Sequence, residues 1–325
     1  MGSPYEVAAR GFQSHRLAMK AAVCMRYGSP EVLEVRDVAT PVPRPSELLV
    51  RIRAAAVTVS DCYIRSAVPS ASLKMRVMVR LFIGLRRPRR PILGAVLAGE
   101  VDRAGARVTK FRVGERVYAF TTLRFGCYAQ YARVPERSLV ARTPANVSDD
   151  EAAAIPYGGL IALPFVRRGN IQAGQRVLIY GASGAIGTAA LQLAKHFGAH
   201  VTAVCGPTNL TLVQSLGADD VLDYTRDRIR EGARFNFVMD AVGRRKTSAL
   251  KIDARTRLEA GGRYVSVDDG TPRVKADDLR VLTELVESGR LVPVIDRRYP
   301  LDAIAQAHRY VEEGHKRGNV IITLP

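Results

Sequence analysis

Three small residues in one predicted turn, Ala182, Gly184 and Gly187, have the types and spacing to bind a ligand. A short apolar run, 177–180, precedes them, a helical pattern follows, and a second apolar run occupies 200–205. A strand, a glycine-rich turn, a helix and a strand within about 30 residues form the setting in which this pattern binds a dinucleotide. Gly184 lets backbone approach a pyrophosphate, Gly187 lets the helix pack on the sheet, and the helix N-terminus offers free N–H groups. The sequence therefore predicts a dinucleotide site, and the alternative is a tight turn without a ligand.

Composition limits the class of protein. The chain has 325 residues, 47% of them hydrophobic, which predicts two globular domains of roughly 100–200 residues each. The longest apolar stretch, near 75–85, contains Arg80 and is shorter than the roughly 20 residues of a membrane span. Four widely spaced cysteines without a CxxC pair favour free thiols over a disulfide framework. We therefore expect a cytoplasmic protein without a membrane partner.

The charge is strongly positive, with a formal net value of +18. Eight Lys or Arg residues occur between Cys62 and Gly99 without one Asp or Glu. A nucleic-acid surface is one interpretation. We favour a solvated face that attracts an acidic cofactor, because the aromatic residues that could stack on bases are limited there to Tyr63 and Phe82. We expect no specific nucleic-acid partner, and a helix followed by a loop over 72–90.

Secondary-structure patterns divide the chain into four parts and predict an α/β fold class. Residues 1–18 show no periodicity and are expected to form a disordered leader. Residues 19–147 alternate short β-rich runs with turns, which indicates a small barrel-like β domain. Residues 148–289 alternate strands with helices, which is typical of a doubly wound parallel sheet. Residues 290–325 are expected to add a strand at 292–296, a helix at 301–313 and a strand at 320–324.

Eight ordered segments resemble the medium-chain dehydrogenase/reductase superfamily and, within it, the zinc-free quinone oxidoreductase branch. They are AAAVTVSDCYIRS (54–66), PILGAVLAGEV (91–101), VGERVYAF (113–120), YAQYARVP (128–135), GASGAIG (181–187), SLGADDVLDY (215–224), DAVG (240–243) and HKRGNVIIT (315–323). The resemblance implies a GroES-like catalytic domain over 19–147, a Rossmann cofactor domain over 148–289 and a C-terminal return to the catalytic domain over 290–325. It also implies that a nicotinamide cofactor lies in a cleft between the two domains.

The resemblance further assigns residues to the cofactor. They come from the glycine-rich turn, the ends of later strands and the C-terminal segment: Ile161, Ala182, Ser183, Gly184, Ala185, Ile186, Gly187, Gly206, Thr208, Asn209, Tyr224, Val242, Ser266, Arg317 and Asn319. An NAD site needs a carboxylate at the end of the second strand for the ribose hydroxyl groups. This chain has no acid over 205–209, so we expect NADP(H). Asn209 stands where relatives hold a Lys, and Arg226, Lys316 or Arg317 could compensate.

The residue types argue against a bound metal. Zinc-using relatives place a Cys after the AAAV segment and a His-Glu pair after the PxxxG turn. The corresponding places here hold Ser60 and Asp61, and Ala95 and Val96, which lack the usual nitrogen and sulfur ligands. Cys62 is nearby but stands alone. We therefore expect no metal site.

Without a metal, an α,β-unsaturated carbonyl or a quinone is the easier substrate, because it is already an electrophile. It needs a hydride donor at close range and a hydrogen-bond donor for the developing oxyanion. The resemblance places Tyr63 at a pocket tyrosine, and the alternative is a packed side chain. Thr58 replaces a pocket Asn and Ile161 replaces a Thr at the nicotinamide end. The predicted function is reduction of a small-molecule enone or quinone; a redox-neutral catalyst or a binding protein, RNA-binding included, is the alternative.

Relatives continue after the strand at 265–267 with a sixth Rossmann strand that pairs with its copy in a second subunit. Here residues 268–275 run directly toward a helix near Ala276. Pro272 cannot donate a hydrogen bond to a sheet, and charged residues flank Val274. We therefore expect a monomer or a dimer built on another surface.

Overall fold

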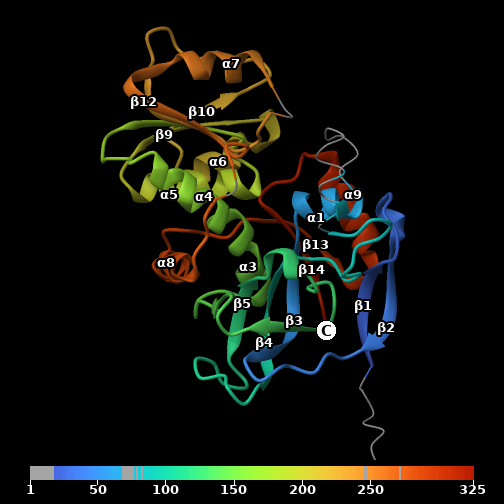
Figure 1. Ribbon diagram of the computed structural model, residues 1–325. Helices are drawn as coiled ribbons and strands as arrows, with labels where there is room; N and C mark the ends of the chain where they lie inside the picture. Colours follow the sequence, from blue (N-terminus) through green and yellow to red (C-terminus); the bar gives the residue numbers. More distant parts are fainter. Residues whose placement is uncertain (1–17, 68–76, 78–79, 82, 245–246, 271) are drawn as a thin grey trace, which may run out of the picture.

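The computed structural model describes residues 18–67, 77, 80–81, 83–244, 247–270 and 272–325. The leader expected at 1–18, apart from Ala18, and much of the helix expected at 72–90 lie outside the described residues. The chain forms two parts with different sheets, shown above and below one another in Figure 1. The fold is α/β, with a parallel sheet in one part and a β-rich domain in the other, as the sequence predicted.

The β-rich part contains an antiparallel pair and a larger sheet. The pair consists of β1 (Ala18–Cys24) and β2 (Leu33–Ala39). Within the described residues, the larger sheet has seven strands in the order β13-β14-β3-β4-β5-β7, with β6 paired to β3. Its strands are β3 (Glu47–Val57), β4 (Val96–Ala104), β5 (Arg116–Phe120), β6 (Tyr131–Pro135), β7 (Leu139–Arg142), β13 (Ile295–Pro300) and β14 (Asn319–Thr323). The C-terminal strands thus complete the sheet begun by the N-terminal part (Figure 1).

The second part is built on a parallel sheet in the order β10-β9-β8-β11-β12, counted over the described residues. The strands are β8 (Arg176–Tyr180), β9 (His200–Cys205), β10 (Asp220–Asp223), β11 (Phe235–Asp240) and β12 (Leu258–Ser266). The order reverses between β8 and β11, and ligands of such sheets bind at the carboxyl ends of the strands near that point. Both faces of β8 are buried: Val177 and Ile179 join one apolar cluster, and Leu178 and Tyr180 join the other.

Helices connect and cover these sheets. The first, α1 (Val59–Arg65), follows β3 directly. The short α3 (Asp149–Ala154) and the longer α4 (Pro156–Arg168) lead from the β-rich part into the parallel sheet (Figure 1). The remaining described helices of four or more residues are α5 (Ala185–His196), α6 (Leu210–Ser215), α7 (Ala249–Thr256), α8 (Ala276–Glu287) and α9 (Ile304–Glu313). One apolar cluster contains residues of α3, α4 and both sheets, so the core runs continuously between the two parts.

The structure corrects one predicted strand. The C-terminal strand predicted at 292–296 is β13, which starts at Ile295; Pro293 precedes it and has no N–H to donate. In the parallel sheet, β12 begins at Leu258, and its register with β11 shifts before Arg263.

β12 is the last strand of the parallel sheet among the described residues. Beyond it the chain makes a turn and reaches α8 at Ala276 without another described strand. Residue 271 lies outside the described residues. The sequence-based expectation that the sixth strand is missing agrees with this path, and the expected subunit state stays a prediction.

Candidate active site

The predicted dinucleotide turn lies between β8 and α5. Gly184 is the N-cap of α5, with an extended backbone (φ −79°, ψ 173°), and the first N–H groups of that helix point out of the turn. A Cβ built on Gly184 would meet only the Gly181 carbonyl oxygen, at 3.7 Å. A Cβ built on Gly187 would lie 2.1 Å from that same oxygen. Gly187 therefore serves helix packing, whereas the space beside Gly184, where the sequence predicts a pyrophosphate, is open to a Cβ.

The other residues of this turn are either buried or half-buried. Ala182 and Ala185 are buried, so only their backbone could contact a ligand. Ser183 and Ile186 are half-buried. The Ala182 N–H donates to the Val204 carbonyl of β9 at 3.0 Å, which ties the turn to the neighbouring strand.

The C-terminal segment runs beside the glycine-rich turn. Gly318 pairs with Gly184 as a parallel bridge, and its N–H donates to the Ser183 carbonyl at 2.8 Å. Arg317 and Asn319, which the resemblance assigns to the cofactor, therefore flank the turn. The Arg317 guanidinium is 3.4 Å from the Asp296 carboxylate and remains half-exposed. The structure thus brings together site residues that are more than a hundred positions apart.

Lys316 adds a positive charge to this place. Its ammonium group donates to the Gly318 carbonyl, next to the turn. Burial lowers the pKa of Lys316 to about 8, against the opposing effect of the Asp296 carboxylate. In the sequence, Lys316 is one of three basic residues that could compensate for the Lys that relatives hold at Asn209. The structure places its charge beside the turn expected to hold the pyrophosphate.

The segment after β9 lies against the same turn. Asn209 is buried, and its amide donates to the Ser183 hydroxyl at 3.2 Å. Thr208 is exposed. A Cβ on Gly206 would lie 3.5 Å from the Tyr224 ring, and that ring is 6.4 Å from the Tyr180 ring, centroid to centroid. These residues form a continuous edge at the carboxyl ends of the strands, where an adenosine group would lie.

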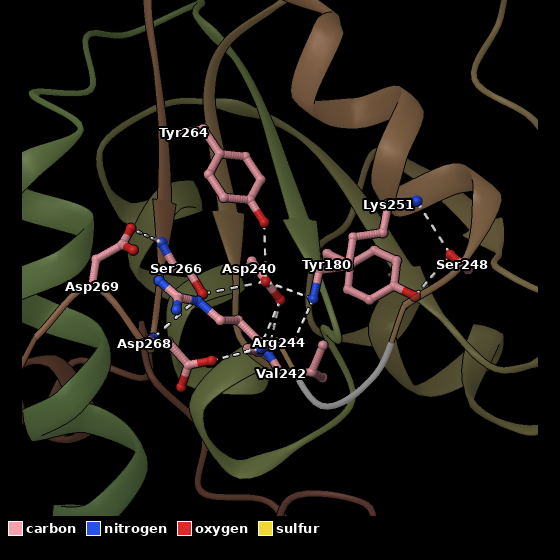
Figure 2. Close-up of polar contacts among 11 residues, drawn as sticks. Tyr180, Asp240, Val242, Arg244, Ser248, Lys251, Tyr264, Ser266, Asp268 and Asp269 are labelled. Carbon is pink, nitrogen blue, oxygen red and sulfur yellow. Dashed lines mark hydrogen bonds and ion pairs between the residues drawn. The ribbon is translucent and has the colours of Figure 1, made fainter. Parts of the chain in front are cut away.

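Asp240, at the end of β11, organises the neighbouring loops (Figure 2). Its carboxylate is fully buried and lies 2.7 Å from the Lys251 ammonium of α7. It accepts hydrogen bonds from the Tyr264 hydroxyl at 3.0 Å and the Ser266 hydroxyl at 3.3 Å. The N–H groups of Val242 and its successor donate to the other carboxylate oxygen, each at 3.1 Å. Val242 and Ser266, both predicted cofactor contacts, are therefore fixed by one buried ion pair that the sequence analysis did not identify.

Thr58 caps α1. Its hydroxyl donates to the Asp61 carboxylate at 2.7 Å and accepts from the Asp61 N–H at 3.2 Å, while its own N–H donates to the carboxylate at 2.9 Å. This is a capping box. The structure thus gives Thr58 a structural role at the start of α1, and its place in a substrate pocket stays a prediction.

Buried polar side chains connect α1 with α9. The Cys62 thiol lies 3.5 Å from His308 Nδ1 of α9. The fully buried Arg65 pairs with Glu312. Burial lowers the pKa of His308 to about 3 and raises the pKa of Asp61 to about 6. His308 is therefore a neutral packed side chain at neutral pH, and α1 presents Ser60 and Tyr63 from a fixed position.

Ser60 and Tyr63 face α4 of the other domain. The Ser60 hydroxyl lies 3.0 Å from the Tyr157 hydroxyl. Tyr63 is half-buried on α1, and its phenol is among the groups that raise the pKa of Tyr157. Ile161 follows Tyr157 by one helical turn and is half-buried. The structure therefore brings the predicted residues Tyr63 and Ile161 to the same junction, together with Ser60 and Tyr157, to which the sequence analysis gave no catalytic role.

Metal ligands do not gather in the described part of the chain. No three His, Cys, Asp or Glu side chains there are arranged so that they could hold a metal ion. All four cysteines are free and buried, as expected. No described helix is both long and apolar enough to span a bilayer.

Comparisons with known proteins define the class. Residues 44–145 match the model of the alcohol dehydrogenase GroES-like domain, and residues 185–284 and 268–322 match two models of zinc-binding dehydrogenases. The mitochondrial NAD(P)H oxidoreductase RTN4IP1 of Bos taurus is 30% identical, covering 94% of this chain and 89% of its own length. The chloroplastic NADPH-dependent alkenal/one oxidoreductase of Arabidopsis thaliana is 30% identical, and the match covers 94% of this chain and 79% of that protein.

Solved structures agree with this class. A quinone oxidoreductase from Coxiella burnetii superposes with a TM-score of 0.82 at 24% identity, covering 95% of this chain and 100% of its own, which shows the fold. An NAD-dependent alcohol dehydrogenase superposes with a TM-score of 0.80 at 29% identity, and the match covers 94% of this chain and 100% of that structure. The chain belongs to the medium-chain dehydrogenase/reductase superfamily and is an oxidoreductase with a nicotinamide cofactor. Within the superfamily it is a member of the quinone oxidoreductase-like branch.

Proposed function

We propose that this protein is a zinc-independent, NADPH-dependent oxidoreductase that reduces the activated C=C bond of an enone, or a quinone. The observation that carries the proposal is the open surface above Gly184, bordered by the first turn of α5 and by the C-terminal segment. When bound there, the reduced nicotinamide supplies a hydride. The names of the relatives support this substrate class, since they include an alkenal/one oxidoreductase and a 2-methylene-furan-3-one reductase.

The preference for NADPH over NADH rests on charge at the end of β9. Cys205 is followed by Gly206, Pro207, Thr208 and Asn209, so no carboxylate is available to bind a free 2′-hydroxyl or to repel a 2′-phosphate. Tyr224 is half-exposed beside Gly206 and offers a hydroxyl to a phosphate. Arg226 is exposed nearby and lies 3.4 Å from the Asp223 carboxylate.

The substrate class follows from the groups at the junction of α1 and α4. Ser60 and Asp61, together with Ala95 and Val96, occupy the places where zinc-using relatives are expected to have ligands, and Ala95 and Val96 are buried apolar side chains. A carbonyl would therefore be polarised by hydroxyl groups of this junction, and the Tyr63 phenol is one of them. An alkene conjugated to a carbonyl, or a quinone, needs no further activation.

A fluorescence titration followed by turnover tests the proposal. We expect saturable NADPH binding, several-fold weaker NADH binding, and oxidation of NADPH when cyclohexenone or a soluble benzoquinone is added, also after exhaustive EDTA treatment. Binding without turnover would support a redox-neutral catalyst instead. The absence of NADPH binding would support a binding role, for which RNA is the first partner to test because of the net charge of +18.

The affinity for NADPH is expected to depend on pH through Lys316. Its pKa is about 8, so the ammonium loses its charge between pH 7 and 9 and attracts the phosphates less at the upper end. The cofactor phosphates, with a pKa of about 6, stay ionised over this range. We expect the Kd to rise about tenfold, the effect of losing one charge-assisted hydrogen bond worth about 1.4 kcal/mol.

Titrations at several pH values measure this effect. Lys316→Met is expected to bind NADPH about as weakly at pH 7 as the parent does at pH 9, with little further pH dependence. Lys20→Met removes an equal charge from β1, where Lys20 pairs with Asp37, and is expected to keep the parent's profile. A Lys316→Met protein with the parent's profile would show that another group is responsible.

We also propose a monomer, or a dimer that does not extend the sheet at β12, because little strand character remains after Ser266. Cytoplasmic location and the lack of a specific nucleic-acid partner remain predictions.

A further inference from the structure

One hydrogen bond joins side chains of the two domains at the junction described above. It connects Ser60 Oγ at the start of α1 with the Tyr157 hydroxyl in the first turn of α4, at 3.0 Å. The two residues are 97 positions apart. Neither residue is the N-cap of its helix. The pair is therefore unexplained by local helix structure.

The position of α4 places Tyr157 close to the dinucleotide turn. A Cβ built on the next residue, Gly158, would lie 2.2 Å from the Ala185 carbonyl oxygen, so the first turn of α4 packs directly on the first residue of α5. Ile161, at the predicted nicotinamide end, lies four residues after Tyr157 on the same side of α4. The phenol thus adjoins the turn from the side that faces the catalytic domain.

The two hydroxyl groups differ in environment. Tyr157 is half-buried and packs edge-on against the Phe120 ring, with centroids 6.3 Å apart. Burial raises the pKa of Tyr157 to about 12, so the phenol keeps its proton at neutral pH. Ser60 is exposed and can exchange its proton with water. When the Ser60 hydroxyl donates to the phenol oxygen, the phenol proton is left for a third group, and the first hydrogen bond strengthens the second.

We propose that Tyr157 is a catalytic residue that donates a hydrogen bond, and then a proton, to the carbonyl oxygen of the substrate, with Ser60 as the positioning residue that resupplies the proton from water. This proposal rests on the proposed function. When bound, the reduced nicotinamide would supply a hydride to the β-carbon of the enone, where a C–H bond forms while the C=C π bond breaks and its electrons move to the carbonyl oxygen. The enolate oxygen takes the proton of Tyr157, which regains one from Ser60, and Ser60 from water. The enol tautomerises in water to the saturated ketone, so that one enone, one reduced cofactor and one H⁺ give one ketone and one oxidised cofactor.

Binding of para-nitrophenolate tests Tyr157 as a hydrogen-bond donor independently of turnover. The phenolate oxygen of this ion is negatively charged, as the enolate oxygen is. We expect the parent, saturated with NADP⁺, to bind this ion and shift its absorption band. Tyr157→Phe is expected to lose the shift and to bind the ion at least about tenfold more weakly. It is also expected to reduce cyclohexenone about 100-fold more slowly, the effect of losing one oxyanion donor, with the Kd for NADPH unchanged. The control is Tyr131→Phe, which removes a half-buried phenol from β6.

Ser60 variants test the second half of the proposal on an exposed residue, where folding is not at risk. Ser60→Ala is expected to weaken para-nitrophenolate binding and slow turnover, and Ser60→Thr, which keeps the hydroxyl, to restore both. If Tyr157→Phe fails to fold, the two Ser60 variants still test whether the Ser60–Tyr157 pair acts on the substrate oxygen.

The outcomes separate this proposal from the proposed function. If Tyr157→Phe and Ser60→Ala bind para-nitrophenolate and reduce cyclohexenone like the parent, Tyr157 only packs and the inference is wrong. If the parent binds para-nitrophenolate through Tyr157 but never oxidises NADPH, the oxyanion site stands and the proposed reaction fails.

Discussion

Gly184→Val is expected to abolish NADPH binding while the protein still folds. The backbone of Gly184 is extended, a conformation that any residue adopts, and its Cβ would meet protein only at 3.7 Å. The new side chain would instead fill the surface above the first turn of α5. We expect the Kd to rise by more than about 100-fold, because the pyrophosphate and two methyl groups would occupy the same space.

The matched control is Gly187→Ala. A Cβ there would lie 2.1 Å from the Gly181 carbonyl and 2.7 Å from the Ala182 Cα, so the backbone of the turn must move. We expect a large loss in the free energy of unfolding for Gly187→Ala. For Gly184→Val we expect a loss of about 1 kcal/mol, since valine is a poor N-cap. Fluorescence titration and urea unfolding measure the two effects, and a Gly184→Val protein that binds NADPH like the parent would contradict this assignment of the cofactor site.

The parallel sheet was predictable because its signals are local. The run 177–180, the glycines after it and the run 200–205 are contiguous, and each element buries apolar residues with its own period. The C-terminal residues Arg317 and Asn319 were predicted only by resemblance. Their position depends on β14 pairing with β3, a contact between the two ends of the chain that periodicity does not reveal.

Other parts of the site had weak signals or none. Thr58 and Asp61 have the spacing of a capping box, so the cap of α1 is a local signal that the sequence contains. Lys251 and Asp240 are charged residues in a helix and at a strand end, where exposure is the usual expectation. Only the docking of α7 beside β11 makes them a buried pair. The contact between Ser60 and Tyr157 depends on the arrangement of two domains, so no local pattern could have indicated it.

Lys251→Met is expected to destabilise the fold strongly. The Asp240 carboxylate is fully buried and the Lys251 side chain nearly so, with their charged atoms 2.7 Å apart. Methionine keeps much of the volume of the lysine stem but leaves a buried negative charge without its cation. The remaining hydrogen bonds, from Tyr264, Ser266 and two backbone N–H groups, do not replace that charge. We expect the free energy of unfolding to fall by about 3–5 kcal/mol, as for other buried pairs that lose one partner.

The double variant Asp240→Asn with Lys251→Met distinguishes an unpaired charge from lost packing. An amide keeps the shape of the carboxylate without its charge, so the double variant is expected to recover much of the stability lost by Lys251→Met. Lys20→Met, which breaks the exposed pair with Asp37, serves as the control and is expected to change the free energy of unfolding by less than about 1 kcal/mol. Urea unfolding of the parent, Asp240→Asn, Lys251→Met and the double variant gives the coupling energy. If Lys251→Met and the double variant were equally unstable, the charge of Asp240 would not be the cause, and the role of this pair in holding the loop of Val242 would have to be given up.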